Sequence, residues 1–194
     1  EAAEEETPKP GEDVFSKNQV RLVATPQLML EAAAKEAEKL GIKSIILSDR
    51  IEGEAKEVAK VHAAIAKQIK HRDQPINSPA IILSGGETTV TVHGKGKGGR
   101  NTEFLLSLLE TLKGEKEISA IAVDTDGIDG SEDNAGAWID HNTFFKAKQL
   151  NLKTNDFLDN NDAYTFFKQL DHLIITGPTM TNVNDFRAIF IGQP

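Results

Sequence analysis

The chain has 194 residues, 39% of them hydrophobic and 27% charged, which is typical of a soluble globular protein with a substantial core. Its net charge of −8 and isoelectric point near 5.2 argue against a nucleic-acid-binding surface. The sequence contains no cysteine, which excludes disulfides, thiolate catalysis and zinc–thiolate sites. No apolar run is long enough to cross a membrane. We therefore expect a cytoplasmic protein with neither a nucleic-acid nor a membrane partner.

Composition divides the chain into three parts. Residues 1–13 are acidic and contain two prolines without apolar periodicity, which predicts a solvated linker or tail. A soft boundary, rich in proline and polar residues, separates an α/β segment over residues 14–78 from a C-terminal domain over residues 79–194. The chain begins at Glu1 rather than methionine, so we expect it to be a piece of a longer protein.

The first half alternates strands and helices. Thr25 and Pro26 are suited to the N-cap and first position of a helix, and Gly41 is suited to its end. A second helix has an apolar stripe at helical spacing. The predicted elements are strand 20–25, helix 26–40, strand 43–48, helix 55–69 and strand 80–84.

The second half begins with residues 88–93 (TTVTVH), whose alternation of polar and apolar residues predicts a strand with one solvated face. Asn142 and Asp162 are plausible caps for two later helices. The other predicted elements are helix 101–112 and strands 118–123, 135–140, 172–176 and 186–191. This pattern predicts an α/β fold, layered α/β/α with a mostly parallel, mixed sheet.

Three unusual loops each follow an apolar strand. They are residues 84–88 (SGGET), 124–136 (DTDGIDGSEDNAG) and 176–185 (TGPTMTNVND). The carboxyl ends of parallel strands share one edge of a sheet, and ligands bind at that edge. We therefore expect the three loops to form one site.

The loop at 124–136 is acidic, without a compensating lysine or arginine. Its carboxylates are Asp124, Asp126, Asp129, Glu132 and Asp133. A magnesium ion would suit Asp124, Asp126 and Asp129, since it prefers carboxylate oxygens. The alternative is an ordinary turn in which the Asp-Gly pairs supply the backbone geometry.

Residues 93–100 (HGKGKGGR) form a cationic loop before the helix that begins near Asn101. Backbone N–H groups at a helix start, with an arginine beside them, can bind an anion. Lys95 and Lys97 could assist or could simply be solvated, whereas Arg100 falls at the helix start and is the stronger candidate.

Gly94, Gly96 and Gly99 also match the G-x-G-x-x-G spacing of a dinucleotide-binding turn. Three features weaken that interpretation: the preceding strand alternates, lysines stand between the glycines, and a cluster of carboxylates begins at Asp124. A lone glycine fingerprint is weak evidence, so we interpret the match as accidental.

Four motifs carry a family resemblance in this order: residues 83–108 (LSGGETTVTVHGKGKGGRNTEFLLSL), 124–140 (DTDGIDGSEDNAGAWID), 160–167 (NNDAYTFF) and 176–191 (TGPTMTNVNDFRAIFI). Together they resemble the C-terminal MOFRL domain of the class II glycerate 2-kinases, whose members are often labelled hydroxypyruvate reductase. The match spans about residues 79–192, and the preceding α/β segment resembles the same family.

The resemblance implies ATP-dependent phosphorylation of D-glycerate to 2-phosphoglycerate, with Mg²⁺, in a cleft between two domains. This chain would lack most of the N-terminal domain and would be inactive alone. Arg100 matches the arginine proposed for the family's active site, and we expect Asp124 and Asp126 to be catalytic beside it. The expected substrate-binding residues are Ser84, Gly85, Gly86, Glu87, Lys95, Lys97, Asn101, Asp129, Thr179, Asn182, Asn184 and Asp185.

Two other functions are also compatible with the sequence. One is an NAD(P)H-dependent hydroxypyruvate reductase, which the family label and the glycine spacing suggest. The other is a non-catalytic module that binds an anion or a metabolite.

Overall fold

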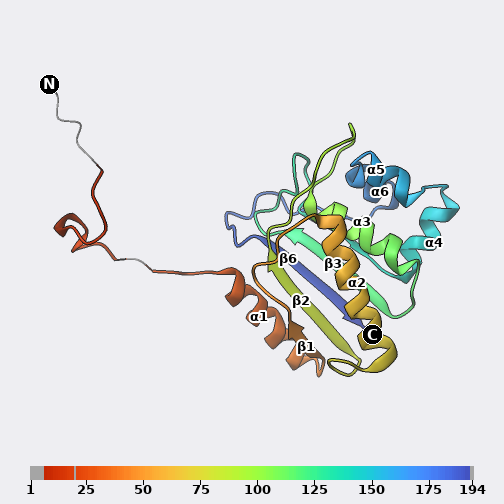
Figure 1. Cartoon of the computed structure of the whole chain (residues 1–194), viewed down its shortest axis with the longest axis horizontal. Helices are drawn as coiled ribbons and strands as arrows, with labels where there is room; N and C mark the ends of the chain where they lie inside the picture. The colour runs from red at the N-terminus through yellow and green to blue at the C-terminus, as the bar shows by residue number, and fades with distance from the viewer. Residues whose placement is uncertain (1–6, 20, 193–194) are drawn as a thin grey trace.

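The computed structural model describes residues 7–19 and 21–192, and its folded body is a six-stranded sheet with helices packed on it (Figure 1). The strands are β1 (Lys43–Ile46), β2 (Ala80–Gly86), β3 (Ile118–Asp124), β4 (Gly136–Ile139), β5 (Leu173–Ile174) and β6 (Asp185–Ile191). The helices are α1 (Pro26–Lys39), α2 (Ala55–Arg72), α3 (Arg100–Leu112), α4 (His141–Gln149), α5 (Thr154–Asp159) and α6 (Ala163–Leu170), with a short 3-10 helix η1 (Asp13–Phe15).

The strand order is β1-β2-β6-β3-β4-β5, so the α/β class and the mixed sheet are confirmed. The sheet is mixed but not mostly parallel, because four of the five strand pairs in the described part of the chain are antiparallel. β1 and β2 pair in parallel, whereas β2–β6, β6–β3, β3–β4 and β4–β5 are antiparallel. The physical reason is that the last strand, β6, inserts between β2 and β3 in the opposite direction. β2 and β3 therefore point the same way without being neighbours.

The helices lie on both faces of the sheet. α2 and α3 pack together over one face, where their apolar side chains meet the inward residues of β2, β3 and β6 in the main core. α1 packs against β1 and β2 on the other face, where its Leu30 lies beside Gly85. Farther across that face, Ile121, Trp138 and Phe190 line an open apolar groove of about 260 Å³.

α1 begins as the sequence predicts. The hydroxyl of Thr25 accepts a hydrogen bond from the backbone N–H of Leu28 at 3.2 Å, and Pro26 takes the first helical position. Gly41, just past the end of the helix, has a φ of +73°, a conformation that glycine adopts without a steric penalty.

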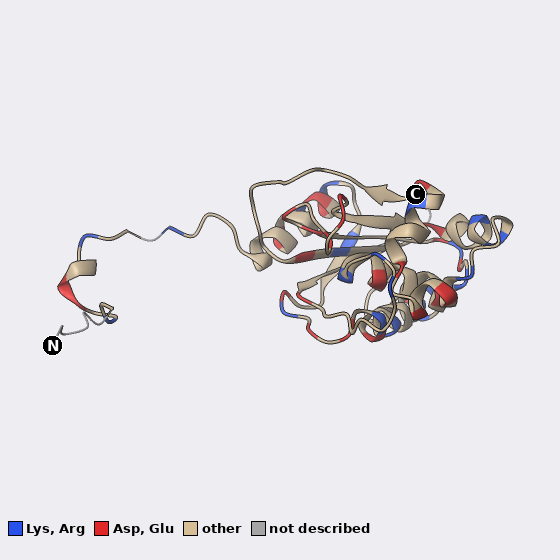
Figure 2. Ribbon diagram, turned by 90° about the horizontal axis from the view of Figure 1, so that it is seen from above, with Lys and Arg blue, Asp and Glu red and all other residues tan. Residues whose placement is uncertain are grey.

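The prediction of a strand at residues 20–25 is wrong for residues 21–25, which have no regular structure; residue 20 lies outside the described residues. Residues 7–19 and 21–25 lead away from the folded body (Figures 1 and 2). Leu22 and Val23 are 78% and 86% exposed. An extended segment forms a stable strand only with a partner to pair with, and none of the described strands pairs with this one.

The predicted strand at residues 88–93 is also absent. Thr89 forms a single bridge with Glu54, and the remainder is a loop. Side chains take the place of a neighbouring strand there. The carboxylate of Glu54 accepts from the N–H and hydroxyl of Thr91, and Asn161 accepts from the N–H of His93.

The boundary expected at residues 78/79 falls between two strands of the same sheet, because β1 and β2 pair with Lys43 opposite Ala80. α5 was not expected from the sequence. None of the helices in the described part of the chain is both long enough and apolar enough to span a membrane.

Candidate functional site

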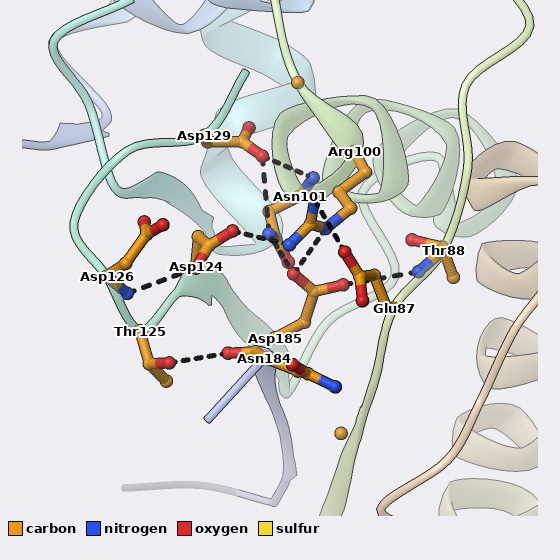
Figure 3. Close-up of polar contacts among 12 residues, drawn as sticks. Glu87, Thr88, Arg100, Asn101, Asp124, Thr125, Asp126, Asp129, Asn184 and Asp185 are labelled. Carbon is orange, nitrogen blue, oxygen red and sulfur yellow. Dashed lines mark hydrogen bonds and ion pairs between the residues drawn. The ribbon is translucent and has the colours of Figure 1, made fainter. Parts of the chain in front are cut away.

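Polar side chains from four elements meet at one edge of the sheet (Figure 3). Glu87 directly follows β2, Asp124 ends β3, Asp185 begins β6, and Arg100 and Asn101 begin α3. The antiparallel insertion of β6 explains the meeting, because it sets Asp185 opposite both Gly86 and Asp124. We call Glu87, Arg100, Asn101, Asp124 and Asp185 the edge cluster.

Arg100 is surrounded by carboxylates. Its Nη2 lies 2.6 Å from Oδ2 of Asp124, and its Nε lies 2.8 Å from Oδ1 of Asp185. Its third nitrogen, Nη1, faces Oε1 of Glu87 at 3.6 Å, and the Glu87 side chain is 60% exposed. Burial opposes the charge of the guanidinium, but Asp185, Asp124 and Glu87 together outweigh that effect and raise the pKa of Arg100. The arginine therefore stays charged, with two tight partners and one loose one.

Asp185 is fully buried and is held from both sides. Its Oδ1 accepts from Arg100 and from the side-chain amide of Asn101 at 2.8 Å. Its Oδ2 accepts from the guanidinium of Arg187 and from the N–H of Thr88. Arg187 is itself fully buried, and burial lowers its pKa.

Arg187 is absent from the residues expected at the site. The sequence did hold a signal: in β6, Asp185, Arg187, Ile189 and Ile191 alternate with the outward residues and lie on the buried face. An arginine on the core-facing side of an apolar strand requires a buried anion as partner.

Asp124 is 4% exposed, and burial raises the pKa of its carboxyl group to about 6 despite the neighbouring Arg100. Its Oδ1 accepts a hydrogen bond from the backbone N–H of Asp126. The carboxylate of Asp126 in turn accepts from the backbone N–H of Ile128. A carboxylate with a pKa near neutrality is suited to accepting and releasing a proton.

The loop after β5 is tied to the acidic loop beside Asp124. Thr125 donates its N–H and hydroxyl to the carbonyl of Asn184, and Thr179 donates its N–H to the carbonyl of Asp126 at 3.0 Å. Asn182 is exposed and accepts from the N–H of Asn184. The two loops therefore form one wall beside the edge cluster.

Asp129 caps α3. Its Oδ1 accepts from the N–H of Asn101, and its Oδ2 accepts from the N–H and hydroxyl of Thr102, all within 2.9 Å. The residue is completely buried, and burial raises its pKa while these hydrogen bonds act in the opposite direction. A carboxylate at a helix start is stabilised by the helix dipole and by the unpaired N–H groups.

The three carboxylates expected to bind magnesium do not form a metal site on their own. Asp129 is engaged by α3, Asp124 by Arg100, and Asp126 by the N–H of Ile128. Within residues 7–19 and 21–192, three or more histidine or acidic side chains do not gather in a way that could hold a metal ion.

The glycines of the cationic loop are explained by packing. Any Cβ at Gly94 would overlap the backbone of Asn160, one at Gly96 would overlap Asp162, and one at Gly99 would overlap Asp129. Asn160, Asn161 and Asp162 also accept the backbone N–H groups of residues 93–97. These donors are therefore already occupied and do not form an anion-binding nest.

The remaining expected residues make no hydrogen bond or ion pair with Arg100 in the described part of the chain. Ser84 is buried on β2, with its hydroxyl 3.0 Å from Nε2 of His62. Gly85 and Gly86 pack against the backbone of residues 48–51. Lys95 is exposed, and the 61%-exposed side chain of Lys97 pairs with Glu132 at 3.1 Å.

The site is acidic overall. Two guanidinium groups, Arg100 and Arg187, face the carboxylates of Glu87, Asp124 and Asp185. Arg100 can bind an anion if a ligand takes the place of the exposed Glu87. A strongly anionic ligand would need additional positive charge from outside these residues.

Comparison with known proteins places these features in a family. The MOFRL family model matches residues 80–185. A protein of Agrobacterium vitis named "Putative hydroxypyruvate reductase" is 49% identical over 189 residues, covering 96% of this chain and 42% of that protein. The glycerate 2-kinase of Pyrococcus horikoshii is 39% identical over 164 residues, covering 84% of this chain and 37% of that protein.

The crystal structure of glycerate kinase from Thermotoga maritima has the same fold, with a TM-score of 0.86 and 36% sequence identity. The similarity covers 89% of this chain and 42% of that one. The chain therefore spans about two fifths of the length of these relatives.

Proposed function

We propose that this chain, which belongs to the MOFRL family, is the C-terminal part of a glycerate 2-kinase and is inactive alone. The reaction would transfer the γ-phosphoryl group of ATP to the 2-hydroxyl of D-glycerate. The names of the relatives from Pyrococcus horikoshii and Thermotoga maritima support this activity, and their greater length supports a second part that completes the site.

One observation supports this function best: Arg100 is oriented by two buried carboxylates and has a replaceable third partner. Phosphoryl transfer depends on positioning and on neutralising negative charge more than on covalent chemistry by the protein. We propose that an anionic group of a substrate displaces Glu87 and binds Nη1 of Arg100. Asp124 and Asp185 would keep the guanidinium in place during the transfer.

Asp124 is our candidate for the proton acceptor. Its carboxylate lies beside Arg100, and its pKa of about 6 leaves it ionised at neutral pH but more basic than an ordinary aspartate. It would accept the proton of the glycerate hydroxyl as the new O–P bond forms. The excess of carboxylates around it implies that the rest of the enzyme supplies further positive charge.

A hydroxypyruvate reductase is the second candidate, because the relative from Agrobacterium vitis is named for that activity. The glycine spacing does not support a reductase, because Gly94, Gly96 and Gly99 pack closely against residues 160–162 and Asp129. A non-catalytic module that binds an anion is the third.

The test is an assay of the longer protein that carries this chain. Glycerate-dependent formation of ADP is expected, and the 194-residue chain alone should form none. Reduction of hydroxypyruvate by NADH without ADP formation would instead favour the reductase. Tight glycerate or phosphate binding without either reaction would favour the non-catalytic module.

The variant Arg100→Ala should lower kcat/KM at least about 100-fold, the scale on which one positioned charge donor acts in catalysis. Arg50→Ala is the matched control, since Arg50 is an exposed arginine with an 87%-exposed side chain. Equal kinetics for the two variants would remove Arg100 from the site.

A further inference from the structure

A cavity of about 260 Å³ borders the edge cluster at Arg100, and the phosphoryl transfer proposed above does not use the rest of its lining. It extends between the loop of residues 88–99 and the first turn of α3. Its lining includes Val90, Val92 and Ala163 as apolar walls, several glycine backbones, and the polar residues Arg100, Glu103 and Asn161. Pockets for whole drug-sized ligands measure roughly 300–1,000 Å³, so this one suits a single ring system.

Glu103 is the unusual member of this lining. It is only 3% exposed, and burial raises the pKa of its carboxyl group. Its Oε2 accepts from the side-chain amide of Asn161 at 3.0 Å, whereas its Oε1 has no hydrogen-bond donor among the described residues. Glu103 lines the cavity, so this oxygen can accept a hydrogen bond from a ligand there.

The neighbouring polar groups do not provide that donor. The amide of Asn161 donates to Glu103 and to the carbonyl of Thr91, and its oxygen accepts from His93 and Gly94. The three nitrogens of Arg100 face Asp124, Asp185 and Glu87. Oε1 of Glu103 is therefore a side-chain acceptor that the described residues leave open to a ligand, beside the apolar walls of Val90, Val92 and Ala163.

This chemistry selects the ligand class. A carboxylate or phosphate group next to Glu103 would be repelled, so the anionic groups of the substrates do not suit the interior of the cavity. A flat, neutral ring that carries an exocyclic amine would fill the apolar walls and donate to Oε1. Arg100 is the cationic residue among those lining the cavity. Phosphate groups attached to such a ring would therefore extend out of the cavity toward Arg100.

We propose that this cavity binds the aminopurine base of the nucleotide that donates the phosphoryl group, with the exocyclic amine donating to Glu103. This inference rests on the proposed kinase function, and it assigns the nucleotide base to this chain rather than to the rest of the enzyme.

The experiment measures equilibrium binding of ADP and IDP to the 194-residue chain by calorimetry, with no glycerate present. IDP carries a carbonyl acceptor where ADP carries the amine donor. ADP is expected to bind at least tenfold more tightly than IDP, the range expected when a buried polar group is left unpaired. Binding of ADP no tighter than that of IDP, or no binding at millimolar ADP, would overturn the assignment.

Two variants identify the site. Glu103→Gln should reduce the preference for ADP to less than threefold. The amide oxygen of glutamine can accept from the amine of ADP, and its NH2 group can donate to the carbonyl of IDP. Val92→Trp should abolish ADP binding by filling the cavity, and the 68% exposure of Val92 allows the change without disturbing the core. Glu57→Gln, an exposed carboxylate of α2, is the matched control and should bind like the wild type. An unchanged preference in Glu103→Gln, or unchanged binding in Val92→Trp, would place the base elsewhere.

This experiment separates the two proposals. Selective ADP binding by the chain, without kinase activity in the longer protein, would leave the cavity assigned and remove the kinase function. Kinase activity without ADP binding by this chain would do the opposite.

Discussion

The Nε of Arg100 donates to Oδ1 of Asp185 over 2.8 Å, although 85 residues separate them in the chain. The contact joins the start of α3 to the start of β6. Asp185 is itself held by Arg187, a second arginine that is fully buried. The position of the arginine at the site therefore depends on a charge in the core that never reaches the surface.

We expect Arg187→Met to destabilise the protein by about 3 kcal/mol or more, because it leaves the buried carboxylate of Asp185 without its core partner. Urea denaturation would measure the loss. The double variant Arg187→Met with Asp185→Asn should recover part of it, since the uncompensated charge is then gone. If the double variant were no more stable than Arg187→Met, Asp185 would not be the reason for the loss.

Asp129→Ala should lower the free energy of unfolding by about 1–2 kcal/mol, the usual cost of losing a helix N-cap. Asp129→Asn should lose less, since its amide oxygen can still accept from an N–H group of α3. Thermal denaturation with and without magnesium provides the control. A magnesium-dependent stabilisation that disappears in Asp129→Asn would mean that Asp129 acts as a metal ligand instead.

Gly96→Ala should destabilise the cationic loop by about 1–3 kcal/mol, because its Cβ would overlap Asp162 and the carbonyl oxygen of Asn160. Gly98→Ala is the matched control in the same loop, with the nearest atoms 3.3 Å from its Cβ. Urea denaturation of both variants would compare them. Equal stability would show that the loop does not depend on its packing against residues 160–162.

Stability should fall as the pH rises from about 4 to 6, owing to Asp124. Its pKa is about 6 in the folded protein and near 3.8 in the unfolded chain, so between these values only the folded state holds the proton. The stabilising contribution is complete below about pH 4 and is lost as the pH passes 6. Denaturation midpoints at several pH values should show a flatter dependence for Asp124→Asn than for the wild type. Identical pH profiles would contradict a raised pKa.

The same group should govern activity in the longer protein. A carboxylate must be ionised to accept a proton, so kcat/KM for glycerate should rise with pH through about 6. In Asp124→Asn the remaining activity should lack this rise. An unchanged pH profile in that variant would assign the proton acceptor to another residue.

Local patterns predicted much of the fold. Apolar runs of strand length located all six strands of the sheet, and helical spacing located α1, α2 and α3. The predicted caps Thr25 and Asp162 precede α1 and α6, whereas Asp140, and not Asn142, caps α4. The exceptions among the described residues were 21–25 and 88–93, whose patterns suit a strand. A strand also needs a neighbour, and at residues 91–93 the side chains of Glu54 and Asn161 bind the backbone instead.

The sequence by itself determined that three chemically unusual loops follow apolar strands, and that Arg100 starts a helix beside them. Only the tertiary structure decided that β6 inserts antiparallel between β2 and β3, which brings Asp185 to Arg100 and buries Arg187 behind it. It also showed that Asp129 caps α3, and that Gly94 and Gly96 lie too close to residues 160–162 to carry a side chain. Strand and helix patterns arise from residues close together in the chain. These contacts join residues far apart in the chain, so they depend on the order and direction of the strands in the assembled sheet.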